Sequence, residues 1–373
     1  MEKLKYTRVE ECCEILDSMR IPITASDRKE GKYPYYGANG IQDYVNDYIF
    51  DDELVLLAED GGNFGSKEKP IAYRVSGKCW VNNHAHVLKP KEEIDVDYLC
   101  YSLMFYKVDG MINGATRKKL TQTAMKKMKI PLRNIVEQKK IVQQLNKIIE
   151  IREKAKKELN LLDNLIQARF VEMFGDPITN SKLLPIEKIE ERYFLKAGIT
   201  TKAEDIHDYL KDKYEIPCYG GNGIRGYVEN LSYEGCYPII GRQGALCGNV
   251  QYATGKFHAT EHAVLVSTLK NDNTMWVYYM LKLMDLYRYH TGAAQPGLAV
   301  KKLNTIDVIV ADINLQNQFA AIVHQINKSK FVIHKFLYCT THNTKSIIKP
   351  RPNTKESGKI RGRETTCRRI LTF

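Results

Sequence analysis

The chain carries one ordered set of motifs twice, and this duplication limits its fold more than any other feature. Residues 33–45 read YPYYGANGIQDYV, and residues 216–228 read IPCYGGNGIRGYV. The offset between the copies then falls by a few residues, which indicates a loop deletion in the second copy between the counterparts of Gly65 and Lys78. Because solenoid repeats are far shorter, this is a duplicated domain with its connector. Later matches keep the same order: His84-Ala85 with His262-Ala263, Gly114-Ala115 with Gly292-Ala293, Leu120 with Leu298, and Gln138 with Gln316.

Each copy is predicted to be α/β, with more strand than helix. Residues 53–58 and 264–266 are short apolar runs, which predict buried strands. Residues 97–107 and 274–284 have amphipathic spacing and are expected to form equivalent helices. The segments 129–132 and 307–310 close the first and the second module.

The connectors have a different character. Residues 136–174 contain neither Gly nor Pro, and their apolar residues recur every three or four positions. This predicts a helix of roughly 40 residues, about 60 Å long, ended by Gly175-Asp176-Pro177. A second such helix begins near residue 313, but its periodicity is lost after Phe336. The predicted division is a module over 1–135, a connector helix over 136–176, a second module over 177–312, a truncated helix over 313–336, and a tail over 337–373.

Charge and composition narrow the class of protein only slightly. The formal net charge is +12, but the tail holds nine Lys or Arg and two Glu, so the body carries only about +5. The tail is expected to be disordered, or to come from out-of-frame translation. No apolar run has membrane-spanning length and no signal peptide is recognisable, so we expect a cytoplasmic protein. The nine cysteines form no C-x-x-C pair and are expected to be reduced, buried thiols.

Five motifs in order resemble the specificity subunit of type I restriction–modification enzymes: GKYPYYGANGI, WVNNHAHVL, GATRKKL, IPLRNIVEQKKIVQQL and FVEMFGDP. The resemblance extends to about Phe336. It implies two target-recognition domains, each reading half of a bipartite, asymmetric DNA site. Two long helices, packed as an antiparallel coiled coil, would hold them apart and set the spacer.

The resemblance also implies partners and the location of the chemistry. Modification (methyltransferase) subunits would dock on the helices, and restriction subunits would translocate and cleave double-stranded DNA. S-adenosylmethionine, ATP and Mg would be bound by those partner subunits, and this chain would hold no cofactor or metal and would be non-catalytic.

Sequence readout needs hydrogen-bonding side chains on loops that approach the bases, and glycine-rich turns supply such positions. Arg242 lies on a loop whose first-copy counterpart, residues 59–65, contains no arginine, so it is a candidate for reading bases. Solvated turns, Asn-Gly turn formation and, for Arg242, a structural salt bridge are the alternative interpretations. The candidate DNA contacts are Tyr36, Asn39, Thr116, Arg117, Lys118, Lys119 and Gln122 in the first module, and Tyr219, Asn222, Arg242, Gln243, Gln295, Lys301 and Lys302 in the second.

One pattern suggests an enzyme instead. His258, Glu261 and His262 fit H-x-x-E-H, which some zinc proteases use on a helix. Here the segment leads into an apolar run typical of a strand, where the two histidines would lie about 13 Å apart, too far to share a zinc ion. No P-loop, adenine-methylase motif or G-x-S-x-G elbow is present. Three alternatives stay open: a truncated or silent recognition subunit, a coiled-coil scaffold without DNA binding, and an autonomous enzyme.

Overall fold

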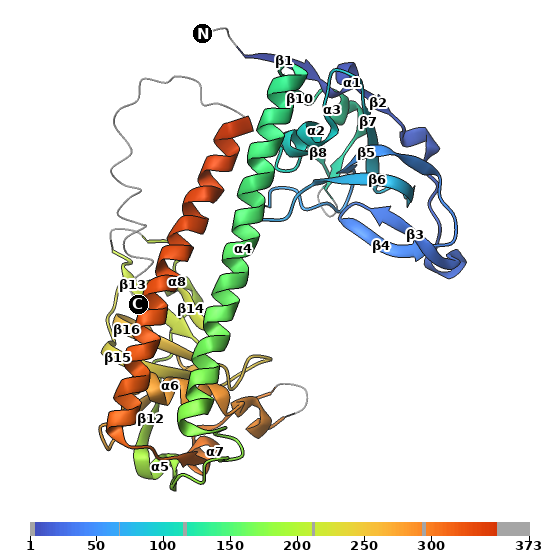
Figure 1. The fold of residues 1–373 in the computed structure, drawn as a ribbon. Coiled ribbons are helices and arrows are strands. Elements are labelled where there is room, and N and C mark those ends of the chain that lie inside the picture. Colours follow the sequence, from blue (N-terminus) through green and yellow to red (C-terminus); the bar gives the residue numbers. More distant parts are fainter. Residues whose placement is uncertain (1–3, 67, 115–117, 211–212, 293–295, 349–373) are drawn as a thin grey trace. The chain divides into compact units, whose positions relative to one another are not determined.

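The computed structural model describes residues 4–66, 68–114, 118–210, 213–292 and 296–348. It divides into two compact units, the first reaching from the N-terminus to Lys154 and including the segment from Leu337, the second spanning Ala155 to Phe336. The boundary falls inside α4 (Ile135–Phe174), the long helix that runs from the first unit into the second (Figure 1). In the described part of the chain, no helix is both long and apolar enough to cross a lipid bilayer.

Unit 1 is built on a six-stranded sheet with helix α2 (Val96–Leu103) packed against it. Neighbouring strands are antiparallel except β3 and β6, which are parallel. A two-stranded ribbon of β1 (Lys5–Arg8) and β10 (Lys129–Leu132) joins the start of the unit to the start of α4. The sheet order is β2 (Cys13–Ile15), β7 (Ala85–Pro90), β5 (Phe50–Ala58), β6 (Ala72–Val81), β3 (Glu30–Gly37) and β4 (Gly40–Val45).

The central strand β5 shows why this sheet forms. Its residues 54–58 are all fully buried, because side chains on both faces of the sheet are covered. Val55 and Leu57 belong to the cluster that contains Leu99 of α2, whereas Leu54 and Leu56 pack in a second cluster with Val87 and Tyr36. A strand covered on both faces reads as a continuous apolar run, which is the pattern that predicted it.

Unit 2 repeats the six-stranded sheet and the two-stranded ribbon strand for strand, which confirms the duplication, whereas the short pair of β8 (Ile112–Asn113) and β9 (Lys119–Leu120) in unit 1 corresponds to a single bridge between Thr291 and Gly297. Its helix α6 (Thr274–Leu283) corresponds to α2, and β11 (Ile186–Lys188) pairs with β18 (Asp307–Ile309) as β1 pairs with β10. The sheet order is β12 (Tyr193–Ala197), β17 (Ala263–Thr268), β15 (Tyr233–Gly241), β16 (Val250–Ala259), β13 (Ile216–Gly220) and β14 (Gly223–Val228).

The deletion between the copies lies in one hairpin loop. Leu57 pairs with Ala72 across the β5–β6 hairpin, and Ile240 pairs with Val250 across β15–β16. The second loop is therefore five residues shorter. The strands β6 and β16 correspond residue for residue from Ala72 and Val250 onward. The deletion therefore lies before Ala72, in the earlier part of the predicted range from Gly65 to Lys78.

The two long helices are closer in length than the sequence predicted. Helix α4 begins one residue before the predicted start and ends at Phe174 as predicted, over 40 residues. The predicted end of the second helix at Phe336 is wrong, because α8 runs from Ile313 to Ile348, over 36 residues. The apolar periodicity fades after Phe336, but the next proline is Pro350. A residue that precedes proline disfavours the helical conformation, so the sequence holds no strong helix breaker before that point. The rest of the predicted tail, residues 349–373, lies outside the described residues.

Within unit 2 the end of α4 packs antiparallel against the start of α8. Phe170 lies 5.3 Å from Phe319 between ring centroids, and both rings lie in a core that includes Trp276 of α6. Asp163, two turns earlier on α4, pairs at 2.6 Å with Lys330, which lies later on α8. The contacts therefore move backward along one helix as they move forward along the other, as the resemblance implied.

The cysteines of the described residues are free thiols, as predicted. Cys236 and Cys339 are exposed, however, so the expectation of burial is wrong for these two. Cys236 is on β15, and Cys339 is near the end of α8.

Phe170 is expected to anchor α4 in unit 2. Phe170→Ala removes a fully buried ring and should lower the free energy of unfolding of unit 2 by about 3–5 kcal/mol. Urea unfolding in a Trp80→Phe background isolates the signal of Trp276, the other of the two tryptophans. Val171→Ala is the control, because Val171 is exposed on the same helix and should change stability by less than about 1 kcal/mol. Equal effects of the two changes would contradict this packing.

Candidate nucleic-acid interface

In unit 1, several loops meet at one end of the sheet and are joined by hydrogen bonds. The Asn39 side chain, in the β3–β4 turn, donates to the carbonyl of Gly61 in the β5–β6 loop at 3.0 Å. The amide of Leu120 donates to the Glu59 carbonyl at 2.7 Å, and the amide of Glu59 donates to the His84 carbonyl at 2.9 Å. The ends of these loops therefore form one connected surface, which we call the loop cluster of unit 1.

The loop cluster of unit 2 uses the same backbone contacts. The amide of Leu298 donates to the Arg242 carbonyl at 2.8 Å, and the amide of Arg242 donates to the His262 carbonyl at 3.1 Å. Arg242 is thus the structural counterpart of Glu59. A Cβ atom at Gly241 would lie 2.1 Å from the carbonyl oxygen of Gly221, so a side chain at this position would separate the β13–β14 turn from the β15–β16 loop.

The predicted tyrosines and asparagines occupy matching places in both clusters. Tyr36 packs 5.7 Å from Tyr73, and Tyr219 packs 5.5 Å from Phe257. Burial raises the pKa of both Tyr36 and Tyr219. These rings are therefore partly structural.

The two asparagines are exposed but carry hydrogen bonds within the clusters. Asn39 bonds to Gly61, and Asn222 accepts a hydrogen bond from the side chain of Asn249. Each asparagine joins a β-turn to the neighbouring loop, which agrees with the alternative interpretation of Asn-Gly as a turn signal.

The basic candidates of unit 1 have different surroundings. Lys118 is exposed, and Lys119 makes a 3.0 Å ion pair with Glu59. Gln122 is partly buried and donates to Asp17 at 2.9 Å, so its amide holds the interior of the unit together. Thr116 and Arg117 lie outside the described residues, as does Gln295 of unit 2.

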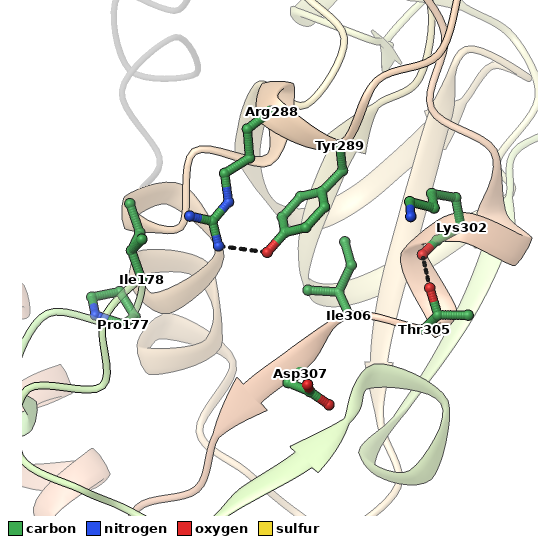
Figure 2. Close-up of a pocket in the computed structure, with 8 residues that line it drawn as sticks. All are labelled: Pro177, Ile178, Arg288, Tyr289, Lys302, Thr305, Ile306 and Asp307. Atoms are coloured by element: carbon green, nitrogen blue, oxygen red, sulfur yellow. Dashed lines mark hydrogen bonds between the residues drawn. The ribbon is translucent and has the colours of Figure 1, made fainter.

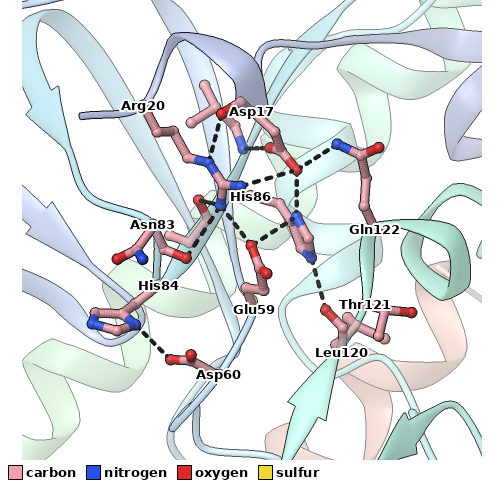
Figure 3. Close-up of polar contacts among 12 residues, drawn as sticks. Asp17, Arg20, Glu59, Asp60, Asn83, His84, His86, Leu120, Thr121 and Gln122 are labelled. Atoms are coloured by element: carbon pink, nitrogen blue, oxygen red, sulfur yellow. Dashed lines mark hydrogen bonds and ion pairs between the residues drawn. The ribbon is translucent and has the colours of Figure 1, made fainter. Parts of the chain in front are cut away.

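A buried charge network supports the loop cluster of unit 1 (Figure 3). His86 is fully buried, with Nδ1 2.7 Å from Asp17 and Nε2 2.8 Å from the carbonyl of Leu120. Each ring nitrogen of His86 therefore faces an oxygen atom that accepts hydrogen bonds. Arg20 donates to Glu59 at 2.6 Å and to the Ala85 carbonyl at 2.8 Å. The guanidinium of Arg20 and the imidazole of His86 thus both contact the carboxylates of Asp17 and Glu59.

The network lowers the pKa of both carboxyl groups. Burial raises the pKa of Asp17, but hydrogen bonds from His86 and Gln122 outweigh it. Burial likewise raises the pKa of Glu59, and hydrogen bonds from Arg20 and Lys119 outweigh it. Both carboxylates thus stay ionised beneath the loops.

The sequence did not indicate this network, because Asp17 and Arg20 belong to no motif, and His86, although it lies within WVNNHAHVL, has no histidine counterpart in the second copy. The position equivalent to His86 in unit 2 is Val264, so the duplication gives no signal for it.

The atoms of Asp17, Glu59 and His86 lie close enough to hold a metal ion. The guanidinium of Arg20 already pairs with Glu59 at 2.6 Å and lies 3.6 Å from Asp17. These two carboxylates are therefore already paired with the positive charge of a side chain. In unit 2, the H-x-x-E-H motif is not on a helix, as predicted, but it is not in one strand either: His258 lies on β16, and Glu261 and His262 lie in the turn before β17. The ring nitrogens of His258 contact the hydroxyls of Thr201 and Ser232.

Arg242 is the arginine among the candidates that lies within the described residues. Its backbone is held on both sides, yet no acidic partner or hydrogen bond to its side chain occurs among the described residues, and its Nε atom is buried without a partner. The alternative of a structural salt bridge is therefore not found there. Gln243 is exposed and forms a β-bridge with Gly297.

The remaining two candidates lie elsewhere on unit 2. Lys301 and Lys302 are exposed on α7 (Val300–Asn304). Lys302 lines a pocket of about 310 Å³ that contains none of the loop-cluster residues described above (Figure 2). The pocket is lined by Pro177, Ile178, Arg288, Tyr289, Lys302, Thr305, Ile306 and Asp307.

The pKa shifts of Asp17 and Glu59 predict how the stability of unit 1 depends on pH. Both folded values are lowered, so this stabilisation is complete above the unfolded carboxyl pKa of about 4 and is lost as the pH falls through the folded values. Asp17→Asn should flatten this acid dependence and lower stability at pH 7 by about 1–3 kcal/mol. Hydrogen exchange of a β5 peptide measures it, with Asp47→Asn, outside the network, as the control. An unchanged acid dependence in Asp17→Asn would contradict the network.

Comparison with known proteins places the chain in a family. The family described as Type I restriction modification DNA specificity domain matches residues 1–161 and 195–337, one match in each half. The chain is 47% identical over 133 residues to the "Type I restriction enzyme EcoprrI specificity subunit" of Escherichia coli, covering 36% of this chain and 33% of that protein. It is 35% identical over 144 residues to the "Putative type I restriction enzyme specificity subunit S.HindORF215P" of Haemophilus influenzae, covering 39% and 37%. The matches thus span about a third of these relatives.

Solved structures share the fold over nearly the whole chain. The S subunit of a type I restriction–modification system from M. genitalium has a TM-score of 0.59 at 16% identity, covering 95% of this chain and 98% of that chain. A chain from work on complex assembly and conformational transition of the type I R-M system has a TM-score of 0.56 at 13% identity, covering 93% and 98%. At these identities the likeness concerns the fold. Together with the family match, it shows that the chain belongs to the type I restriction–modification specificity subunits.

Proposed function

We propose that this chain is the non-catalytic, sequence-specific DNA-binding subunit of a type I restriction–modification complex, and that each unit reads one half of a bipartite site. The observation that carries the proposal is the pair of loop clusters. Each cluster is built on its own six-stranded sheet, and the two sheets have the same strand order. The backbone contacts of the two clusters are also the same, yet Arg242 occupies in unit 2 the position of Glu59 in unit 1. A shared scaffold with different side chains at its loops suits two readers of different sequences.

The chemistry of the loop clusters fits base readout. An arginine with a free guanidinium can donate two hydrogen bonds to the major-groove edge of guanine. Exposed lysines such as Lys118 suit contacts to phosphate, which position the protein on the duplex without specifying sequence. In unit 1, by contrast, Glu59 is already paired with Arg20 and Lys119.

The long helices are the proposed docking surface for the modification subunits. Leu161 and Leu165 are exposed one turn apart on α4, and Val332 is exposed on α8. Apolar side chains on long helices suit a protein partner. In this proposal, S-adenosylmethionine, ATP and Mg are bound by the modification and restriction subunits, and this chain supplies recognition and spacing.

Genome-wide mapping of methylated adenines tests the function. The chain is co-expressed with its modification subunit in a host that lacks the system, and the modified adenines are mapped. We expect one bipartite motif with a fixed spacer. Purified chain should also bind duplexes containing that motif, with an affinity that falls steeply between low and moderate salt. The absence of both methylation and DNA retention at low salt would contradict the proposal and favour a scaffold.

Arg242→Ala tests the proposed base contact. The loss of a bidentate arginine–guanine pair should cost about 1–3 kcal/mol of discrimination at one base pair, so that position of one half-site should become degenerate in the methylation map while the other half-site stays the same. Lys256→Ala is the matched control, because it removes one exposed positive charge from β16 of the same unit. If both variants weaken modification uniformly without relaxing any position, Arg242 does not read a base.

A further inference from the structure

One buried glutamine joins each unit to its long helix. In unit 1, Gln138 is fully buried in the first turn of α4. Its Oε1 atom accepts from the amide of Asp95 at 2.8 Å, and its Nε2 atom donates to the carbonyls of Glu93 at 2.8 Å and Arg133 at 2.9 Å. One side-chain amide thus connects the long helix to the segment that begins α2.

We call this set of hydrogen bonds around the buried glutamine the joint of the unit, and unit 2 has the same joint. Gln316 is fully buried in the first turn of α8. Its Oε1 atom accepts from the amide of Asn273 at 2.8 Å, and its Nε2 atom donates to the carbonyl of Ala311 at 3.0 Å. Its second acceptor is the carboxylate of Asp272, at 2.7 Å.

Both joints connect two helix starts that are themselves capped. In unit 1, Asp95 accepts from the amide of Tyr98 at 2.9 Å and caps α2, while Asn134 accepts from the amide of Glu137 at 2.9 Å and caps α4. Asn273 and Asp312 do the same for α6 and α8. Capping fixes the local path of the chain at each helix start, so the glutamine bridges two defined points.

The length of the helix makes this joint consequential. A helix of 40 residues is about 60 Å long at 1.5 Å per residue, so a tilt of about 5° at its base displaces its far end by about 5 Å. Successive base pairs of B-DNA are about 3.4 Å apart. A joint that is loose by a few degrees could not distinguish spacers that differ by one base pair.

We propose that Gln138 and Gln316 are positioning residues that fix the direction in which each long helix leaves its unit, and thereby restrict the spacer between the two half-sites. This rests on the proposed function. Glutamine suits the role because it offers an acceptor and two donor hydrogens in one plane. An apolar replacement removes these partners from the backbone groups at the joint.

The two joints differ in strength. Asp272 is also held by Arg192, whose Nε and Nη2 atoms each lie 2.6 Å from its carboxylate oxygens. Unit 1 has Cys12 at the position of Arg192 in the matching helix, so it lacks this ion pair. The second bond across the joint of unit 2 comes from the side chain of Asn273, which donates to Asn317 of α8 at 2.8 Å. Because this bond remains when Gln316 is lost, loss of Gln138 is expected to have the larger effect.

Gln138→Met and Gln316→Met, which keep side-chain length and remove the amide, test the proposal. Gln144→Met and Gln325→Met are the controls, because these glutamines are exposed on the same two helices. Each variant is co-expressed with the modification subunit, and the modified sites are sorted by the spacer between their halves. We expect the half-sites to stay unchanged, while the share of modified sites with a spacer one base pair longer or shorter rises about tenfold in Gln138→Met, less in Gln316→Met and not in the controls.

Purified variants are also tested for binding to duplexes with the wild-type spacer and with one base pair more or fewer. The proposal is supported if the dissociation constants for the altered spacers differ less from that for the wild-type spacer in the variants than in the wild-type chain. A folded variant, by circular dichroism, that keeps the wild-type spacer preference overturns it, as does a change in the half-sites. Unfolding of both methionine variants also overturns it, since the glutamines are then purely structural. If the wild-type chain reads no bipartite site, the proposed function itself has failed, which is a separate result.

Discussion

The hydrogen bonds of one buried glutamine in each unit are the constraint on which the rest of the architecture depends. Gln138 and Gln316 lie at matching positions, each accepting from the capping residue of a short helix and donating to a carbonyl just before its own long helix. Two capped helices meet at each joint. Since the helices are the longest elements of the chain, any error in direction at these two points grows along about 60 Å of helix.

The loop clusters and the joints lie at opposite ends of the same strands. β7 begins with Ala85, which pairs with Ala58 beside the loop cluster, and ends with Pro90, which pairs with Cys13 shortly before the joint. β17 has the same arrangement between Gly241 and Tyr193. A strand of six residues separates the two regions by about 20 Å. Side chains in the loops can therefore change while the joint keeps its geometry.

The sequence predicted the parts of the fold that depend on local pattern. Strand β5 and helix α4 followed from an apolar run and from periodicity, and the duplication required equal topologies. The end of α8 was missed because amphipathic spacing reports which face of a helix packs, whereas continuation of the helix needs only the absence of a breaker before Pro350. Sheet order depends on pairing between distant strands and has no local signal.

The candidate site likewise contains features that the local sequence predicted and features that depend on contacts between distant residues. Arg242 could be named because the two copies differ there. The hydrogen bond from Gln122 to Asp17 could not be predicted, because the sequence pattern of a polar residue beside a basic turn is the same whether its side chain faces solvent or the interior. Asp17, Arg20 and His86 meet only in the folded chain. Their network holds Glu59 as a paired carboxylate, whereas Arg242 at the same position has no partner among the described residues. The interior of each unit thus determines whether the charge at this position has a partner, so replacing Glu59 with arginine would place a second guanidinium beside Arg20 and leave Asp17 as the one carboxylate of the network in unit 1.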